Sequence, residues 1–326
     1  MDFFGLPTGF SHDVKIYNIG TASVTGQGWQ TWQKPRGVSM VCMITIAGGG
    51  GGGGGMGGDT SAARGGGSGG ACSGIARFIC PAIFVPDTMY VQVGAGGAGG
   101  AGSSAGAAPG AGVAGTNSFI AMHRPATPGI PTLPNIICYS GVNAPGGGLG
   151  GTSAGAVAGG TVPTIAVTQP TNVWGQWFAT VGLVGAAASA NGSGGTAVTA
   201  WAAIPMSPGA GAGGVVITTP VSQTGAGQTA TAIIGDGSAI YGVTGAGALV
   251  TAGSVASPNG GSGIKKLTPF FNTGGASGAS IAAAAGGHGG NGGYGCGGGG
   301  GGSASTSNTG GKGGNGGDGL VVIISW

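Results

Sequence analysis

The sequence predicts an all-β fold whose strands are joined by glycine-rich connections. Short runs of β-branched and other apolar residues recur along the chain, and each run is bounded by Gly or Pro, which is typical of strands. No segment combines a helical apolar period with helix caps and a charged face, so helices are not expected. The connections stand out because 86 of the 326 residues are Gly.

Apolar residues dominate each predicted strand. The longest, Val38–Ala47, reads VSMVCMITIA and stops at the glycine run Gly48–Gly55. The terminal run Leu320–Trp326 has the same character. The other predicted strands are Ile75–Cys80, Met89–Val93, Ser118–Met122, Asn135–Ser140, Val215–Thr218, Ala232–Ile234 and Ala239–Val243.

The glycine tracts carry a period of three. Each ordered Gly costs about 0.5–1 kcal/mol more backbone entropy than Ala, so ordered tracts need compensating interactions. Gly-Gly-X triplets run in phase over residues 286–294 and 310–318. A polyproline-II-type helix has three residues per turn and no internal hydrogen bonds, so these triplets place every X on one edge and leave two edges bare. Bare edges let neighbouring helices approach and exchange backbone hydrogen bonds, which predicts a packed polyglycine-II helix bundle.

Collagen is the other fold built on a glycine triplet. It requires a strict Gly-X-Y repeat with abundant Pro. The two triplet tracts are short and contain no Pro. Collagen is therefore excluded.

Charge is scarce throughout the chain. Charged residues make up 5 % of the sequence, the six acids are all Asp, and the net charge is +3. Such a surface is poorly suited to neutralising phosphates, so nucleic acid is not an expected partner. Residues 125–235 contain no charged residue at all. We expect this uncharged middle insertion to pack within the domain, against copies of the chain, or against neighbouring proteins.

The five cysteines are scattered. Cys42, Cys72, Cys80, Cys138 and Cys296 form neither a CxxC pair nor a zinc-site spacing. They read as small buried hydrophobic residues of a protein made in a reducing compartment, with a Cys72–Cys80 bridge as the alternative.

Targeting segments are not expected either. The N-terminus lacks the basic and long apolar regions of a secretory signal. The best candidate for a membrane span, Val173–Ala190, contains Gln176 and has no flanking Lys or Arg, so we do not expect it to cross a membrane.

Glycine-containing motifs of enzymes occur, but without their required context. Gly94–Gly99 matches the dinucleotide pattern GxGxxG, yet no helix follows and the next acid is Asp236. Gly66–Gly70 and Gly151–Gly155 match the GxSxG pattern without a strand-to-helix turn. The sequence predicts no enzyme, no cofactor and no metal site.

The first 37 residues differ in composition from residues 38–326, the glycine-rich domain. They combine charged residues with the aromatic residues Phe3, Phe4, Phe10, Trp29 and Trp32. This mixture predicts an N-terminal arm that docks against another protein. The alternative is a first hairpin that caps the core of the same domain.

The order of these features resembles a known family. Trp32-Gln33-Lys34-Pro35 leads into Val38–Ala47 and Gly48–Gly55, then comes Tyr90-Val91-Gln92-Val93-Gly94, and Gly313–Ile323 closes the chain. The pattern resembles the glycine-rich domain of bacteriophage tail-fibre and related virion proteins. It is also similar to the glycine-rich extracellular region of anaplastic lymphoma kinase, which has many more cysteines. The resemblance covers residues 29–122 and 285–326, and it implies a jelly-roll-like β-sandwich whose loops form a polyglycine-II bundle.

The resemblance implies a non-enzymatic bacteriophage virion protein, assembled in the host cytoplasm. A tail-fibre or tail-tip adhesin is the first hypothesis, and a capsid decoration or head-fibre protein without receptor binding is the alternative. Expected partners are other virion proteins, a host surface glycan or outer-membrane protein, and further copies of the chain. The candidate host-contact residues, each of which could instead belong to the core or to a solvated edge, are Trp174, Trp177, Trp201, His288, Asn291 and Tyr294.

Overall fold

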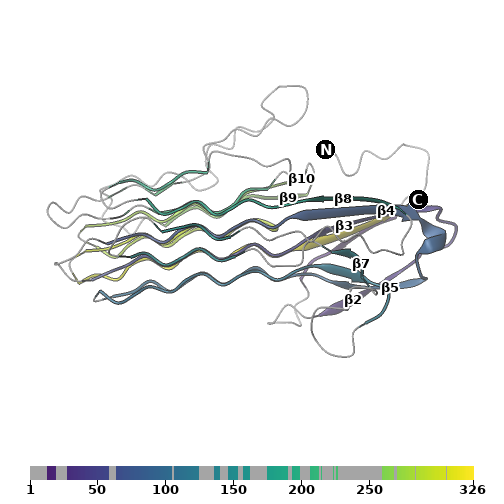
Figure 1. Cartoon of the computed structure of the whole chain (residues 1–326), viewed down its shortest axis with the longest axis horizontal. Helices are drawn as coiled ribbons and strands as arrows, with labels where there is room; N and C mark the ends of the chain where they lie inside the picture. The colour runs from purple at the N-terminus through teal and green to yellow at the C-terminus, as the bar shows by residue number, and fades with distance from the viewer. Residues whose placement is uncertain are drawn as a thin grey trace, which may run out of the picture.

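The computed structural model shows an elongated all-β protein with a β-sandwich at one end (Figure 1). From the sandwich, glycine-rich segments run side by side toward the opposite end. The structure describes residues 13–19, 28–58, 64–104, 106–124, 136–139, 146–152, 157–161, 175–189, 193–198, 206–212, 214, 223, 225–226, 259–267, 270–282, 284–305 and 307–326.

The larger sheet of the sandwich has five antiparallel strands in the order β1-β11-β3-β4-β8. β3 and β11 lie in its interior, and their register pairs Ile44 with Val322. The strands span Asp13–Tyr17 (β1), Met40–Ile46 (β3), Ile75–Pro81 (β4), Gln176–Thr180 (β8) and Leu320–Ser325 (β11).

The second sheet has four antiparallel strands in the order β2-β5-β6-β7. They span Trp29–Gln33 (β2), Thr88–Gln92 (β5), Phe119–Ala121 (β6) and Ile136–Tyr139 (β7). A 3-10 turn, η1 (Ala82–Phe84), follows β4, and a separate ribbon pairs β9 (Lys265–Leu267) with β10 (Phe270–Asn272).

The predicted all-β sandwich is confirmed. The expected strands at β3, β4, β5, β6, β7 and β11 are present, and each begins and ends within two residues of its predicted bounds. The predictions at Val215–Thr218, Ala232–Ile234 and Ala239–Val243 lie outside the described residues. The jelly-roll connectivity stays a prediction.

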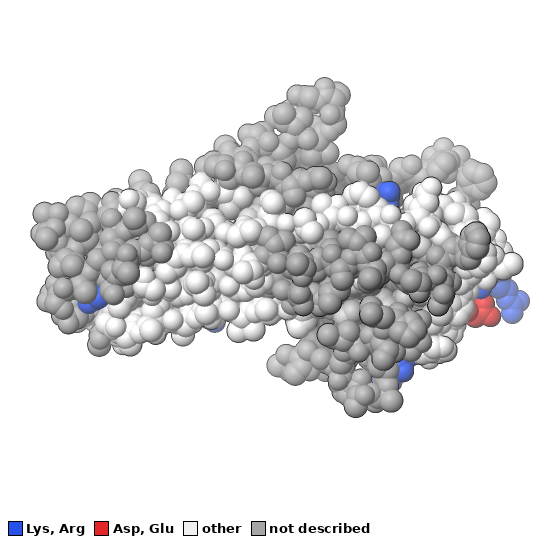
Figure 2. All heavy atoms as spheres, viewed as in Figure 1, with Lys and Arg blue, Asp and Glu red and all other residues white. Residues whose placement is uncertain are grey.

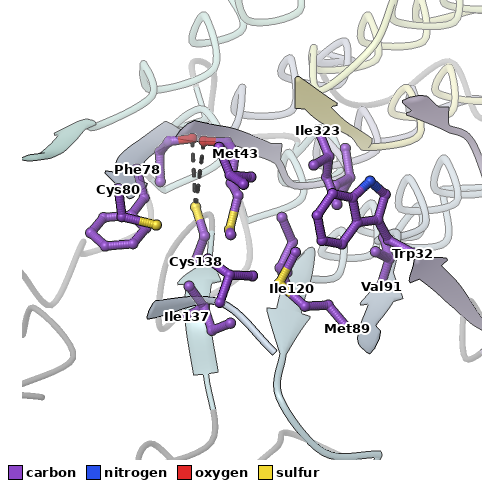
Figure 3. Packing of buried hydrophobic residues seen from close by; sticks show 14 of the residues in the cluster. Trp32, Met43, Phe78, Cys80, Met89, Val91, Ile120, Ile137, Cys138 and Ile323 are labelled. Carbon is purple, nitrogen blue, oxygen red and sulfur yellow. Dashed lines mark hydrogen bonds between the residues drawn. The ribbon is translucent and has the colours of Figure 1, made fainter. Parts of the chain in front are cut away.

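The core lies between the two sheets (Figure 3). Met43 from β3 and Phe78 from β4 face Met89 from β5 and Ile120 from β6, and all four side chains are buried. Ile44 and the residues that alternate with it along β3 point to the other face of the sheet. There they form a second buried cluster with Met206 and Cys296. β3 and β11 are therefore covered on both faces, which explains their continuous apolar sequences.

The five cysteines are free thiols, and all are buried. The Cys72–Cys80 bridge considered above is therefore not formed. The Cys138 thiol donates weak hydrogen bonds to the carbonyl oxygens of Met43 (3.9 Å) and Ala76 (4.0 Å), drawn as dashed lines in Figure 3. Burial raises the pKa of Cys72 and of Cys138 to about 12.

Raised thiol pKa values predict a loss of stability in alkali. An unfolded thiol ionises near pH 8.5, whereas Cys138 stays protonated in the fold until about pH 12. Between these values the unfolded state releases a proton that the folded state keeps, so the free energy of unfolding falls by about 1 kcal/mol per such thiol from pH 9 to pH 10. Urea denaturation at pH 7.5, 9 and 10 measures this slope. Cys138→Ala should reduce the pH dependence of the unfolding free energy by the amount that corresponds to one released proton. An unchanged slope would contradict the burial of this thiol.

The glycine bundle is the second part of the fold. It comprises residues 48–56, 65–73, 94–103, 110–117, 146–152, 157–161, 181–189, 206–212, 273–281, 284–293, 296–304 and 310–319, joined by backbone hydrogen bonds. Most of these segments continue directly from a strand or lead back into one. For example, β3 leads outward into residues 48–56, and residues 310–319 return to β11.

Residues 48–56 show how the bundle is bonded. The Gly49 amide donates to the Gly317 carbonyl oxygen (2.8 Å), and the Gly52 amide donates to the Gly314 carbonyl oxygen (2.8 Å). Each step advances three residues on one segment and retreats three on the other. A three-residue repeat is that of a threefold extended helix, and it leaves the intervening amides free to bond other neighbours.

Six segments surround residues 48–56. Three antiparallel segments accept hydrogen bonds from its amides, and three parallel segments donate hydrogen bonds to its carbonyl oxygens. The acceptors lie in 110–116, 311–317 and 65–71, and the donors lie in 97–103, 298–304 and 148–151. The backbone polarity of this buried segment is thereby satisfied without regular sheet, and the cost of ordering glycine is offset.

Close approach explains the run of pure glycine. A Cβ atom added at Gly52 would lie 2.0 Å from the carbonyl oxygen of Gly299, and one at Gly53 would lie 1.9 Å from that of Leu149. A side chain at any position from Gly48 to Gly55 would meet backbone.

The membrane-span candidate Val173–Ala190 contains β8, an edge strand of the larger sheet. In the part of the chain that the structure describes, no helix is long and apolar enough to cross a membrane.

Candidate interaction surfaces

The N-terminal segment is built into the sandwich. β1 pairs with β11 in the larger sheet, and β2 pairs with β5 in the smaller one. The two strands lie in different sheets, so in the described residues this segment is neither a separate arm nor a hairpin. Phe3, Phe4 and Phe10 lie outside the described residues.

The two tryptophans of β2 belong to the domain's own packing. Trp32 is 1 % exposed and lies in the central core, so its side chain is covered by the chain itself and is not available for docking. Trp29 is half-buried and packs against Phe119 and Tyr139. The proposed docking role of Trp32 is therefore withdrawn.

An open depression lies at the sandwich end that faces away from the bundle. There, the turn after β2 and the residues around η1 line a depression of about 470 Å³. Lys34 is held beside it by an ion pair with Asp87 (2.9 Å) and by donating a hydrogen bond to the Val85 carbonyl oxygen (2.8 Å). The rim carries the exposed Arg36 guanidinium and Ile83, which is 84 % exposed.

Charge is concentrated at this end in the view of Figure 2. The red surface visible there lies at the sandwich end, beside blue surface, while the described side of the bundle that faces the viewer is almost entirely white. The exposed Ile83 therefore lies beside fixed charges, whereas most of the described side of the bundle seen in this view carries no charge.

Trp177 lies at the edge of the sandwich. Its ring is tilted against Phe78 (6.2 Å between centroids) and Tyr139 (5.8 Å), and the residue is half-buried. Its neighbour Phe178 is 49 % exposed and lies under the Arg77 guanidinium, 5.6 Å from the ring centroid. Trp177 thus acts chiefly in packing, and Trp174 and Trp201 lie outside the described residues.

His288 and Asn291 lie on an exposed edge of the bundle. The His288 Nδ1 accepts a hydrogen bond from the Lys312 amide (2.8 Å), and the Asn291 Oδ1 accepts one from the Asn315 amide (2.9 Å). Both side chains therefore satisfy backbone amides of the adjacent segment. Tyr294, the next X residue, is half-buried, and the Lys265 ammonium lies 5.3 Å from its ring centroid.

Along this exposed edge, which we call the polar edge, further side chains accept hydrogen bonds from backbone amides of adjacent segments. These residues were not singled out from the sequence. The Asn315 Oδ1 accepts from the Gly99 amide (2.9 Å), and the Asp318 Oδ1 accepts from the Gly96 amide (3.1 Å). The Asn259 Oδ1 accepts from the His288 amide (2.9 Å). For Asn315 and Asp318, the available signal was their X position in the second triplet tract, whereas Asn259 lies outside both tracts.

The end of the bundle farthest from the sandwich holds a buried arginine. Arg64 is 3 % exposed, and its Nε donates to the Gly58 carbonyl oxygen (3.5 Å). Nearby, Ser103 accepts a hydrogen bond from the Gly57 amide through its hydroxyl (3.4 Å). These side chains therefore bond backbone groups at the far end of the described bundle.

No protein-family model matches this sequence, and no curated protein matches it significantly.

Proposed function

We propose that this chain is a non-enzymatic structural protein of a bacteriophage virion, a tail-fibre or tail-tip component that contacts the host surface. The observation that carries the proposal is its division into two parts: a sandwich with an open depression at its outer end, and a bundle that projects from the opposite side of the sandwich (Figure 1). An adhesin needs both an attachment end and a presenting end.

The bonding of the bundle supports a presenting role. The central segment is hydrogen-bonded to six neighbours, so bending it would distort bonds in several directions at once. A scaffold of this kind holds the far end of the described bundle at a fixed distance from the sandwich. Recognition residues are commonly carried by loops on such rigid scaffolds.

The sandwich end supports an attachment role. The Lys34–Asp87 ion pair and the exposed Ile83 surround an open depression on the side away from the bundle. We propose that another virion protein docks there, and that the far end of the bundle meets a host glycan or outer-membrane protein.

The second candidate is a capsid decoration or head-fibre protein without receptor binding. It is favoured by the side of the bundle near β8, where Val181 is 50 % and Val184 is 54 % exposed. Apolar residues without nearby charge suit permanent burial in an assembly.

Immunogold labelling of purified particles of the phage that encodes the chain separates the two candidates. Label at the tail tip or fibres is expected for the adhesin, and label on the capsid would favour the decoration protein. Particles without label would overturn both.

Binding to host cells tests receptor contact directly. The fluorescently labelled protein is expected to bind susceptible cells and to reduce phage adsorption in competition. Tail label together with neither binding nor competition would leave a structural tail protein and remove the adhesin.

A further inference from the structure

One side of the glycine bundle is formed by residues 110–117 and 146–152, which we name the open face. The two segments lie side by side, since the Gly112 amide donates to the Gly148 carbonyl oxygen (2.8 Å). Both also bond the central segment: the Gly51 amide donates to Val113 (2.9 Å), and the Gly148 amide donates to Gly51 (2.8 Å). The open face therefore rests on a fixed base.

The backbone of the open face has unused hydrogen-bonding groups. Ala111, Ala114, Gly147 and Gly150 neither donate nor accept a backbone hydrogen bond within the described chain. In both segments these residues are three apart, and none is fully buried. The face thus presents rows of amide and carbonyl groups with the repeat of the helices themselves.

The polar edge on another side of the bundle shows the contrast. There, the outward amides of Lys312 and Asn315 are bonded by the side chains of His288 and Asn291. On the open face, Ala and Gly occupy the positions that would need such acceptors. On the polar edge, side chains of the chain itself bond the outward amides. On the open face, the outward backbone groups can still bond a partner, as those of an edge strand can in a sheet.

The side chains of the open face are apolar and uncharged. Val113 is 57 % exposed and Leu149 is 48 % exposed, and neither 110–117 nor 146–152 contains a charged residue. The threefold phase turns Val113 toward the side of residues 94–103 and Leu149 toward the side of residues 157–161, so the two apolar side chains flank the open face. Covering them would remove apolar surface from water.

We propose that the open face binds the open face of a second copy of this chain, forming a twofold dimer. Groups three residues apart on a threefold helix are separated by about 9 Å, so the covering backbone needs the same repeat. A β-strand repeats every two residues, at about 6.7 Å, and would fall out of register. The open face carries both donors and acceptors, so it is self-complementary, as a twofold interface requires.

Analytical ultracentrifugation of the purified full-length chain over a concentration series tests the dimer. The wild type is expected to sediment at twice the chain mass of 30.0 kDa at high concentration. Leu149→Lys places a charge in the interface and should yield monomer. Ile16→Lys, on the edge strand β1 where the side chain is 39 % exposed, is the matched control and should remain dimeric.

Amide hydrogen exchange locates the interface. Amides of Ala111, Ala114, Gly147 and Gly150 should exchange at least tenfold more slowly in the dimer than in diluted wild type or in Leu149→Lys. An unchanged unfolding midpoint would show that Leu149→Lys folds normally. If Leu149→Lys fails to fold, Val113→Lys takes its place.

A wild type that stays monomeric at millimolar concentration would overturn the proposal, whatever other protein binds the face. So would a dimer whose open-face amides exchange as in the monomer. The proposal does not rest on the virion role, because a monomer found in phage particles would remove the dimer alone.

Discussion

Replacing Gly52 by Ala is expected to prevent the chain from reaching its native fold. The new Cβ atom would lie 2.0 Å from the carbonyl oxygen of Gly299 and 2.5 Å from its carbonyl carbon. Both are backbone atoms held by further segments, so the neighbour cannot yield by a simple rotamer change. Relief requires a separation of at least 3.0 Å, which moves a whole segment.

The energetic effect follows from the bonds that such a movement breaks. The Gly52 amide donates to Gly314 (2.8 Å), and its carbonyl oxygen accepts from Gly100 (2.8 Å). Each buried group left unpaired costs about 1–3 kcal/mol, so the loss of several exceeds about 5 kcal/mol. That is comparable with the whole stability of a typical domain, about 5–15 kcal/mol.

The measurement is the soluble yield and the thermal unfolding of Gly52→Ala beside Lys312→Ala. Lys312 already carries a Cβ atom on the exposed edge, so its replacement should change stability by less than about 0.5 kcal/mol. A Gly52→Ala protein that unfolds within a few degrees of the wild type would contradict the contacts of the central segment.

The second large effect is expected at Trp32. Its side chain is 1 % exposed in the core between the sheets, so Trp32→Ala should lower the free energy of unfolding by about 3–5 kcal/mol through the cavity that it leaves. Trp32→Phe should cost clearly less. It keeps most of the apolar volume and removes the Nε1 donor, which is buried and has no partner among the described residues.

Urea denaturation followed by circular dichroism gives the order of the two variants. The half-buried Trp29 supplies the control, since Trp29→Ala should cost less than Trp32→Ala. Equal losses for Trp32→Phe and Trp32→Ala would mean that the indole N–H has a bond which the geometry does not show.

Sequence patterns predicted the strands that are buried on both faces. β3 and β11 form continuous apolar runs because clusters cover each side of their sheet. β1 and β8 are edge strands with partly exposed side chains, and their sequences DVKIY and QWFAT lie in the N-terminal segment and the uncharged middle insertion, where no strand was predicted. The mixture of aromatic and charged residues around β2 predicts an arm, and no local pattern marks its pairing because its partner β5 lies more than fifty residues away.

The bundle was predictable in kind but not in arrangement. The triplets of residues 286–294 indicate one exposed edge, and the structure shows His288 and Asn291 exposed beside buried Gly287 and Gly290. Which segments become neighbours could not be predicted, because glycine edges carry no distinguishing side chain. For the same reason, the acceptor role of His288 depends on a neighbour that the sequence does not specify.

The number of side chains per triplet reports the position of a segment in the bundle. Gly48–Gly55 has none and is surrounded by six segments. Residues 286–294 have one per triplet and lie at an edge. This relation is testable by inspection of any protein with such tracts.

The threefold repeat also restricts which changes of length the gene can accept. Deleting one residue from the tract 286–294 would turn every later side chain by about 120° and drive His288 or Asn291 into a neighbouring backbone. Removal of a whole triplet would keep the direction of each later side chain. The shortened segment would nevertheless be one triplet too short to keep all its hydrogen bonds with the segments bonded to it. The length of the glycine bundle therefore cannot change through one tract alone. It changes only when many tracts gain or lose residues together, in steps of three codons.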